Sequence, residues 1–448
     1  MKDWIGILLA AGNSTRMRSK LPKPLHTICG KPMISYSVDT MRKAGIDNIV
    51  IVCGERSEKD LKGLFQDSVV YIKQIEALGT GHAVLQCAPE VEGRYPNIVV
   101  MVGDAPLIKS TTIQSLIDTH TSSKSTLTIL TATETVGQDM GRIERDSSGI
   151  IQKVIEPSAD LNAAHIKEVN AGVYCFNAKW MWQALRKLSP AKNGEYYLTE
   201  LVNMAVFDNK KIESFVSTNG AELIGVNDRV QLSFAEALIR QNIREYWMRE
   251  GVTIIDPTST FIDASVVMDI DITIHPNSSI LGKTQIGQGT ILGPGIIITD
   301  SIIGQNCKII SSAIESSTLE SDIHVGPYSH IRPGTYIESQ VHIGNFAEIK
   351  ASRLAKGVKM GHFGFLGDAT VGPNANLGAG MITCNYDGVA KHTTEIGENA
   401  FIGSDTMLVA PVKIGRNAST GAGSVVTKDV PAYRLAKGIP ARITERSQ

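Results

Sequence analysis

Two hydrophobic patterns divide the chain into an alternating half and a repetitive half. In the first half, short apolar and β-branched runs at Ile5–Leu9, Ile49–Val52 and Asn97–Val102 predict buried strands. Stretches such as Met33–Ala44 lie between them, with apolar residues at helical spacing. This alternation favours a mostly parallel sheet with helices on both faces, where ligands bind at the carboxyl ends of the strands.

A single long helix is predicted after the first half. Between Asn227 and Glu250, apolar residues recur at the spacing of one helix face. Asn227 or Asp228 can cap the start of this helix, and Gly251 follows its end. We expect the helix to be a rigid connector.

From Gly251 onward an apolar residue recurs at every sixth position, and glycine often follows it directly. This period predicts a triangular coil, in which each hexad forms one short strand and one corner around an apolar interior. We expect Gly or Asn at corners that need a positive φ, and a turn of about 18 residues. The repeating residues form three series: Ile274, Ile280, Ile286, Leu292 and Ile298; Val325, Ile331, Ile337, Ile343 and Ile349; Ile396, Ile402, Leu408, Ile414, Thr420 and Val426.

Composition narrows the classes of partner. A chain of 448 residues exceeds one ordinary hydrophobic core, and its formal net charge of −1 argues against nucleic acid or an anionic membrane as main partner. The apolar run Trp4–Ala11 is short and leads into Gly12-Asn13-Ser14 instead of a small-residue cleavage site, so we do not expect a signal peptide, and no stretch has the length of a membrane span. The six cysteines form no CxxC pair, which indicates free thiols and a cytoplasmic location.

A loop of small residues follows the first predicted strand. It runs Leu9-Ala10-Ala11-Gly12-Asn13-Ser14-Thr15-Arg16-Met17, and Leu21-Pro22-Lys23-Pro24 comes next. Small residues let backbone N–H groups approach an anion, and Arg16 and Lys23 add positive charge. Taken alone, such a loop is typical of any turn between a strand and a helix.

With later segments, this loop resembles the sugar-1-phosphate nucleotidyltransferases, which carry a Rossmann-like α/β domain. The segments are Gln74, Leu78–Ala83, Val102-Gly103-Asp104, Gly141-Arg142, Glu156, Asn170-Ala171-Gly172, Gly194–Tyr197 and Gly225-Val226-Asn227. The resemblance implies that a sugar-1-phosphate oxygen attacks the α-phosphate of a nucleoside triphosphate and releases pyrophosphate.

The same resemblance implies a role for individual residues. Arg16 and Lys23 would be catalytic, and Asp104 and Asn227 would bind Mg²⁺, although a helix N-cap favours the same side chain at Asn227. The expected nucleotide contacts are Leu9, Ala10, Ala11, Gly12, Lys23, Gln74, Gly79 and Thr80. The expected sugar-phosphate contacts of this half are Gly141, Glu156, Asn170 and Asn227.

The repetitive half resembles the left-handed parallel β-helix of hexapeptide-repeat acyltransferases. Its longer motifs are Ile331–Gly334, Gly344–Lys350, Gly361-His362, Leu366–Asp368, Asn376–Gly380 and Ile382–Gly388, followed by Lys391. With the first half, they resemble the bifunctional enzymes that join an N-acetylglucosamine-1-phosphate uridylyltransferase to a glucosamine-1-phosphate acetyltransferase. This implies UTP and acetyl-CoA as co-substrates, both sugar phosphates as substrates, and a homotrimer with sites between subunits.

Carried over by position, His362 would be the general base that deprotonates the sugar amine, a task that suits an imidazole. Glu348 could orient this imidazole. The expected sugar-phosphate contacts are Arg332, Lys350, Phe365, Asn376 and Lys391. The expected acetyl-CoA contacts are Ala379, Asn385, Tyr386, Ser404, Ala422 and Lys437.

The resemblance divides the chain into a nucleotidyltransferase domain at 1–226, a linker helix at 227–250 and a β-helix domain at 251–448. The chain shows five departures from the family pattern. They are Asn13-Ser14 for Lys-Gly, Met140 for Tyr, Phe365 for Tyr, Met381 for Thr beside the coenzyme groove, and an absent coenzyme-binding arginine that Lys437 or Arg442 could replace.

Three alternatives remain open on the sequence. The chain could be a nucleotidyltransferase with a single activity, whose β-helix serves assembly or regulation. It could be a non-enzymatic scaffold, like the translation-factor subunits that share this two-domain plan. His324, His330 and His342 could also bind Zn²⁺ across a subunit boundary, as in β-helices that hydrate carbon dioxide.

Overall fold

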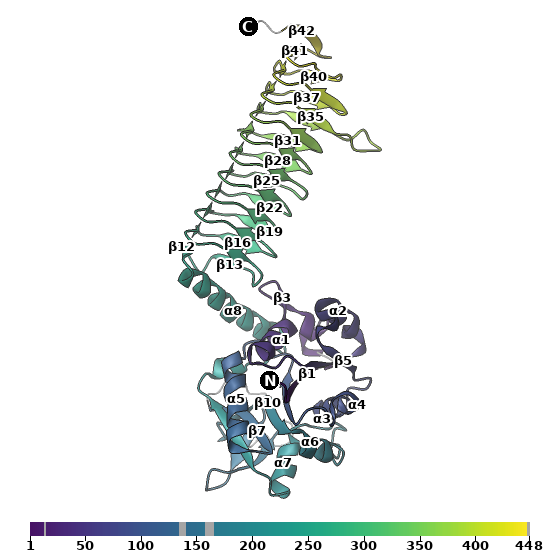
Figure 1. Ribbon diagram of the computed structural model, residues 1–448, viewed down its shortest axis with the longest axis vertical. Helices are drawn as coiled ribbons and strands as arrows, with labels where there is room; N and C mark the ends of the chain where they lie inside the picture. The colour runs from purple at the N-terminus through teal and green to yellow at the C-terminus, as the bar shows by residue number, and fades with distance from the viewer. Residues whose placement is uncertain (13–14, 134–139, 157–164, 446–448) are drawn as a thin grey trace. The chain divides into compact units, whose positions relative to one another are not determined.

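The computed structural model describes residues 1–12, 15–133, 140–156 and 165–445. Contacts divide it into two compact units, Met1–Ile239 and Arg240–Gln448 (Figure 1). The division falls inside the predicted linker helix. No helix in the described ranges is both long and apolar enough to cross a membrane.

The first unit is built on one twisted sheet with the order β11-β7-β10-β6-β1-β4-β5. Strands β6, β1, β4 and β5 run parallel, whereas β10 is antiparallel to both of its neighbours β6 and β7. The strands are β1 (Trp4–Ala10), β4 (Ile49–Cys53), β5 (Val70–Lys73), β6 (Asn97–Val102), β7 (Leu127–Ala132), β8 (Arg142–Arg145), β9 (Ile151–Ile155), β10 (Val169–Asn177) and β11 (Ile212–Ser217).

Helices cover both faces of this sheet, as predicted. Neighbouring side chains of β1 point to opposite faces, so Leu8 packs in one hydrophobic core and Ile7 in the other. The core around Leu8 contains side chains of α1 (Met33–Lys43), α2 (Glu55–Phe65) and α5 (Ser110–Ser123), which cover one face of the sheet. On the other face lie α3 (Thr80–Leu85), α4 (Ala88–Val91), α6 (Ala178–Leu185) and α7 (Glu200–Phe207).

The predicted long helix is α8 (Arg229–Arg249). Asp228 caps it, because the Asp228 carboxylate accepts a 2.8 Å hydrogen bond from the Gln231 N–H. The Asn227 side chain takes no part in this cap and instead contacts Lys23. Of the two caps that the sequence allowed, the structure therefore uses Asp228.

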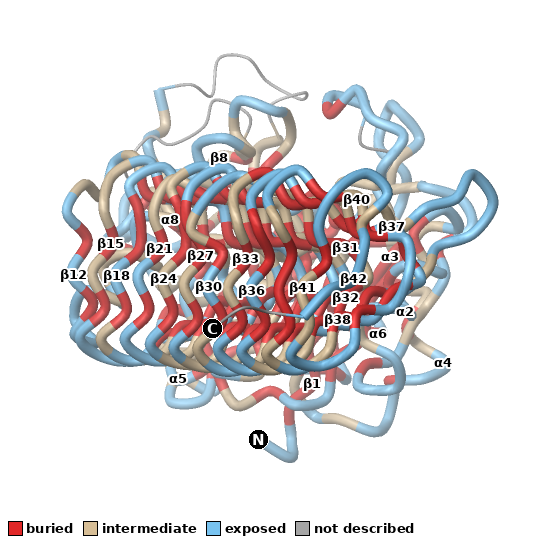
Figure 2. Tube along the Cα trace, turned by 90° about the horizontal axis from the view of Figure 1, so that it is seen from above, coloured by how far each residue is buried: buried red, intermediate tan, exposed pale blue. Residues whose placement is uncertain are grey.

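The second unit is a triangular parallel β-helix, whose strands from β12 (Thr253–Ile254) to β42 (Arg442–Glu445) form three sheets. Each sheet takes every third strand along most of its length, so one turn of the coil, here called a rung, contributes one strand to each sheet. The inward residues of one sheet, from Ile280 to Leu366, are fully buried. Figure 2 shows buried positions aligned along the coil and exposed corners between them.

Some rungs are shorter than the predicted turn of about 18 residues. Ile298 lies opposite Ile314, a step of 16 residues, because two pairs of consecutive inward residues, Ile298 and Ile303 and then Ile309 and Ile314, are separated by five positions instead of six. Shortened corners of this kind interrupt the hexad phase between Ile298 and Val325. The strands on both sides of each corner still pair in parallel.

The expected reason for glycine after the inward residue is wrong at several positions. Gly304 and Gly344 do not have a positive φ. A Cβ at Gly344 would lie 1.8 Å from the carbonyl oxygen of Gly361, so glycine is required there because adjacent rungs approach closely. Many corners with positive φ carry Asp, Ser or an aromatic residue instead, among them Asp322, Ser311 and Tyr328.

Candidate active sites

The carboxyl ends of β1 and β6 position the first candidate site. Leu9 and Ala10 end β1, and Ala11 and Gly12 continue into the small-residue loop. A Cβ at Gly12 would meet no atom within 4 Å, so the space beside this loop is open to a ligand. Arg16 follows in a short 3-10 helix, and the departures Asn13 and Ser14 lie outside the described residues.

Three predicted residues from distant parts of the sequence meet in this site. The Lys23 ammonium forms an ion pair with the Asp104 carboxylate and lies 3.0 Å from the side-chain oxygen of Asn227. The Val226 N–H donates a 2.8 Å hydrogen bond to the Asp104 carbonyl, which joins the two loops. The oxygens of Asp104 and Asn227 therefore point toward one cation.

The predicted nucleotide contacts Gln74, Gly79 and Thr80 form the next part of the wall. Gln74 follows β5, and its side-chain nitrogen donates a 3.1 Å hydrogen bond to the Gly79 carbonyl. Gly79 has a φ of +101°, and a Cβ there would lie 2.6 Å from the carbonyl oxygen of Tyr196. The Thr80 hydroxyl accepts a hydrogen bond from the Leu198 N–H, which holds the segment around Tyr196 against this turn.

The predicted sugar contacts gather around an irregular part of β10. The pairing of β10 with β7 shifts register between Asn170 and Tyr174, a bulge that redirects side chains. The Asn170 amide donates a 2.6 Å hydrogen bond to the buried Tyr174 hydroxyl and accepts one from the Gly172 N–H. Burial raises the pKa of Tyr174, so its hydroxyl keeps its proton.

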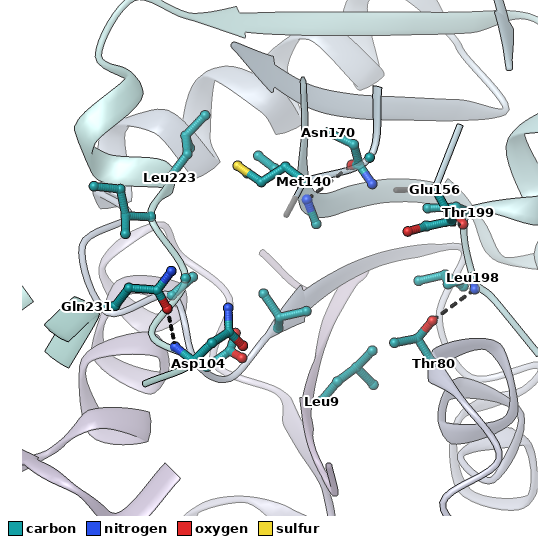
Figure 3. A pocket seen from close by; sticks show the side chains of 18 of the residues that line it. Leu9, Thr80, Asp104, Met140, Glu156, Asn170, Leu198, Thr199, Leu223 and Gln231 are labelled. Carbon is teal, nitrogen blue, oxygen red and sulfur yellow. Dashed lines mark hydrogen bonds between the residues drawn. The ribbon is translucent and has the colours of Figure 1, made fainter. Parts of the chain in front are cut away.

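Two adjacent cavities contain these residues. One of about 450 Å³ is lined by the small-residue loop, Arg16, Lys23, Gln74 and Gly79. The other, of about 580 Å³, is lined by Gly141, Glu156, Asn170 and Asn227 (Figure 3). Asp104 and Thr80 line both cavities, so the predicted nucleotide and sugar contacts lie on two sides of the predicted metal ligands.

The structure adds residues that the sequence analysis did not select. The Thr199 hydroxyl donates a 2.7 Å hydrogen bond to the Glu156 carboxylate, and Thr199 lines the larger cavity with Tyr174. Thr199 lies two positions after the Gly194–Tyr197 motif, so extending that motif would have found it. Tyr174 had no sequence signal, because only the bulge brings it next to Asn170.

The second candidate site begins at one corner of the β-helix. His362 is an exposed corner residue after β30 (Lys359–Met360). Backbone hydrogen bonds join this corner to those of later rungs: the Gly380 N–H donates to the Phe363 carbonyl, the Asp405 N–H to Ala379, and the Gly423 N–H to Ser404. The predicted acetyl-CoA residues Ala379, Ser404 and Ala422 therefore follow one edge of the coil, with His362 at its start.

The predicted phosphate-binding cations lie near the opposite end of β31 (Gly364–Gly367), where Lys350 at the end of β28 (Ala347–Lys350) pairs with Gly367. Arg332 and Lys391 lower the pKa of Lys350, and Lys391 has the larger effect, because like charges disfavour each other. Arg332 also donates a 2.6 Å hydrogen bond to Glu348. Glu348 thus pairs with Arg332 and makes no hydrogen bond to His362 within the described chain, so its expected role at His362 stays a prediction for a site between subunits.

A loop between β34 (Ile382–Cys384) and β35 (Thr394–Ile396) carries Asn385, Tyr386 and Lys391. The Asn385 amide donates a 2.5 Å hydrogen bond to the Asp368 carboxylate. Within the loop, the N–H groups of Val389 and Ala390 and the imidazole of His392 bond to Asp387, and these contacts keep the pKa of Asp387 far below its usual value. The loop therefore has a defined internal structure.

The remaining predicted positions are divided among several elements. Phe365 lies on β31 opposite Glu348, and Asn376 lies opposite Lys359 on the sheet that precedes the His362 corner. Lys437 lies against Gly421, next to the Ala422 corner. The Met381 side chain is fully buried inside the coil, so it packs in the apolar interior and is not exposed on the surface.

The three histidines of the zinc alternative do not form a cluster within the described chain. His324 and His342 are neighbours on one sheet, with ring centroids 5.0 Å apart. His330 lies on another sheet and pairs with Glu315. Within the described ranges of one chain, two of these three imidazoles are therefore neighbours and the third lies apart from them.

Comparisons with known proteins cover both halves. The family model "Nucleotidyl transferase" matches residues 5–248, and "Bacterial transferase hexapeptide (six repeats)" matches residues 393–428. Several relatives bear the name "Bifunctional protein GlmU". The one from Heliobacterium modesticaldum is 43% identical over 434 residues, covering 96% of this chain and 94% of its own length.

Two others show similar values. The relative from Carboxydothermus hydrogenoformans is 44% identical and covers 96% of both chains. The relative from Geobacillus sp. is 42% identical and covers 96% of this chain and 94% of its own. The hexapeptide match and the stacked parallel strands together confirm the predicted fold class of an α/β domain followed by a left-handed β-helix.

Proposed function

The chain belongs to the family of bifunctional GlmU proteins, and from this premise we propose how its residues carry out two reactions. One reaction transfers the acetyl group of acetyl-CoA to glucosamine-1-phosphate. The other transfers the uridylyl group of UTP to N-acetylglucosamine-1-phosphate and gives UDP-N-acetylglucosamine and pyrophosphate. The chain is therefore an enzyme with small-molecule substrates.

The uridylyl transfer takes place between the two cavities of the first unit. Uracil occupies the cavity beside Gln74 and Gly79, and the sugar lies in the cavity beside Glu156 and Asn170. A phosphate oxygen of the sugar phosphate attacks the α-phosphorus of UTP, and the bond to pyrophosphate breaks on the opposite side. Arg16 and Lys23 neutralise the charge on the phosphate oxygens, so catalysis consists mainly of positioning and electrostatic stabilisation.

The donor set at Asp104 and Asn227 fits Mg²⁺. A carboxylate oxygen and an amide oxygen are hard ligands of the kind that Mg²⁺ prefers, and both already face the same ammonium group of Lys23. These two residues would hold the ion, and a bound Mg²⁺ would supply charge neutralisation at the triphosphate. This convergence between the two cavities is the observation that carries the proposal.

The acetyl transfer begins at the His362 corner. The neutral imidazole accepts a proton from the sugar ammonium, and the freed amine nitrogen attacks the thioester carbon of acetyl-CoA. A tetrahedral oxyanion forms and is stabilised by N–H donors such as the Asn385 amide. Its collapse breaks the carbon–sulfur bond, and the coenzyme leaves as a thiol after taking a proton.

The arrangement of this second site supports a homotrimer. His362 precedes β31, whereas the Lys350 and Lys391 cations lie at the far end of that strand. The four residues of β31 span roughly 13 Å, more than the distance between the amine and the phosphate of one sugar phosphate. We propose that a neighbouring copy brings its own cations beside His362, as the family resemblance implies.

One assay tests both activities. The protein is incubated with glucosamine-1-phosphate, acetyl-CoA, UTP and Mg²⁺, and products are identified by mass spectrometry. We expect UDP-N-acetylglucosamine, its loss when acetyl-CoA is omitted, and its return when N-acetylglucosamine-1-phosphate replaces the amine. Failure of the last arm would refute the uridylyl proposal, and absence of free coenzyme thiol would refute the acetyl proposal.

Phe365 favours a second candidate, a chain with uridylyltransferase activity alone. Its ring lies beside Asn385 and offers no hydroxyl group to a phosphate. A His362→Ala variant separates the two cases. In the bifunctional case we expect the variant to lose the acetyl transfer that the wild type performs and to keep uridylyl transfer. If the wild type itself performs no acetyl transfer, the chain has the single activity.

A cytoplasmic location stays a prediction, supported by six cysteines without a disulfide.

A further inference from the structure

We propose that His82 is a positioning residue that fixes the Gln74 amide, so that only the amide oxygen faces the nucleotide base and uracil is selected over cytosine. The inference rests on the proposed function, which places the base of UTP beside Gln74. It concerns His82 and Gln86, which lie on or next to α3 and line neither cavity.

The orientation of the Gln74 amide follows from its neighbours. Gln74 is only 6% exposed, and it lines the smaller cavity. Its nitrogen lies 3.1 Å from the Gly79 carbonyl, which can only accept a hydrogen bond, so an N–H must point there. The same nitrogen lies 3.0 Å from His82 Nδ1. Both N–H groups are therefore used, and the amide oxygen has no partner among the described residues.

These contacts also fix the hydrogen on the imidazole ring. Because the Gln74 amide donates to Nδ1 of His82, the neutral ring carries its hydrogen on Nε2. The Gln86 amide nitrogen lies 3.0 Å from this Nε2 and 3.4 Å from the His82 carbonyl. Two N–H groups cannot form a hydrogen bond, so with the ring hydrogen on Nε2 we assign the Gln86 amide the flipped orientation, in which its carbonyl oxygen accepts from the ring and the longer contact to the His82 carbonyl is lost. The chain of hydrogen bonds thus runs from Gln74 to His82 and from His82 to Gln86.

The resulting pattern distinguishes pyrimidine bases. The free Gln74 oxygen is an acceptor, and the Gly79 N–H has no partner within the described ranges and is a donor. Uracil presents an N3–H donor next to a carbonyl acceptor, which matches this pair. Cytosine presents an unprotonated N3, whose lone pair would face the Gln74 oxygen. Without His82 only the Gly79 carbonyl would hold this orientation, so rotating the amide to offer its N–H to cytosine would cost less free energy.

Two variants of nearly the same shape test the role of the acceptor. Asn at position 82 can place its oxygen where the ring Nδ1 lies, whereas Leu fills the same space without an acceptor. We measure kcat/KM for UTP and for CTP with N-acetylglucosamine-1-phosphate in the full-length wild type, His82→Leu and His82→Asn. The ratio of UTP to CTP should fall about tenfold in His82→Leu and stay near wild type in His82→Asn.

The KM for the sugar phosphate should be unchanged in both variants, because His82 does not line the sugar cavity. An unchanged ratio in His82→Leu would overturn the proposal, and so would an equal fall in both variants, which would indicate loss of shape alone. If His82→Leu does not fold, the His82→Asn and Gln86→Met variants give the comparison, and Gln86→Met should lower the ratio. A wild type that uses neither nucleotide would instead refute the proposed function.

Discussion

A buried hydroxyl next to the sugar cavity gives the first prediction for a single residue. Tyr174 accepts a hydrogen bond from Asn170, and its own proton has no acceptor among the described residues. Because burial raises the pKa of Tyr174, this proton stays available as a donor to the sugar. In Tyr174→Phe we expect the KM for N-acetylglucosamine-1-phosphate to rise about three- to tenfold, with an unchanged KM for UTP.

Initial rates at varied sugar phosphate measure this effect. Tyr71→Phe is the matched control, because the Tyr71 hydroxyl bonds to the carbonyls of Leu61 and Gln66 and lines neither cavity. If both variants have the same sugar KM as the wild type, Tyr174 does not contact the sugar.

His120 gives a pH dependence of stability in the first unit. Burial lowers the pKa of His120 to about 4, and its ring packs against Trp4 and lies 2.9 Å from the Thr128 hydroxyl. Since the unfolded histidine titrates near 6.5, the unfolded state binds more protons between these values. The free energy of unfolding should therefore fall by up to about 3 kcal/mol as the pH drops from 6.5 to 4.

Urea unfolding followed by tryptophan fluorescence at several pH values measures this loss. His120→Leu removes the titrating group and should flatten the part of the pH profile between 4 and 6.5. If the free energy of unfolding of His120→Leu falls between pH 6.5 and 4 with the same slope as that of the wild type, other groups cause the pH dependence.

Individual residues also show what a sequence can reveal. Asp104 and Lys23 were predicted from motifs, because each follows a recognisable strand or loop, and the structure brings them together. Tyr174 and His82 were not selected. Their importance arises from hydrogen bonds to Asn170 and Gln74, which depend on a bulge and on a side-chain orientation that no local pattern encodes.

Among the elements, α5 begins without a capping side chain of its own. Its N-cap residue is Lys109, whose side chain cannot accept a hydrogen bond from the helix. The buried Glu222 carboxylate takes this role: it accepts hydrogen bonds from the Lys109 N–H and the Thr112 hydroxyl, and another from Ser217. Glu222 thereby holds the loop that leads to Asn227 against the start of α5.

Removing this carboxylate should destabilise the first unit. In Glu222→Ala, the buried hydroxyls of Thr112 and Ser217 lose their acceptor, and the negative charge at the helix start is lost. We expect the free energy of unfolding to fall by about 2–3 kcal/mol in denaturant titrations. Glu55→Ala, at the exposed first turn of α2, should change it by less than about 0.5 kcal/mol. Equal effects in both variants would contradict the capping role.

The β-helix shows why its architecture was predictable and its detail was not. Inward residues such as Ile331 and Ile349 repeat because every strand faces the same apolar interior, and this constraint is local in the sequence. The shortened corners near Ile314 and the glycine at Gly344 depend on how one rung contacts the next. Such contacts join residues 16 or more positions apart, and the six-residue repeat of apolar positions does not reveal them.

At the scale of the whole molecule, the two-domain plan and the second site depend on different information. The change from helical and strand-like patterns to hexads is visible in the sequence, so the order of domains could be predicted. The distribution of the second site between two ends of β31 was not visible, because the position of His362 relative to Lys391 requires the stacked rungs. This distribution leads to a prediction about assembly.

If neighbouring copies complete each site, two inactive variants should restore each other. His362→Ala lacks the base and Lys391→Ala lacks a phosphate-binding cation, and each alone should lose most acetyl transfer. When both are unfolded together and refolded as a mixture, each mixed trimer contains interfaces that join an intact His362 to an intact Lys391. A closed ring with random composition predicts up to about a quarter of wild-type activity.

The readout is release of coenzyme thiol, with the oligomeric state measured by light scattering. Uridylyl transfer is the internal control and should stay at the wild-type level in every sample, because its residues lie in the first unit. Refolding each variant separately before mixing should give no recovery, since subunits then do not exchange. If the co-refolded mixture forms trimers and is no more active than its components, each chain must supply both His362 and Lys391 to its own site.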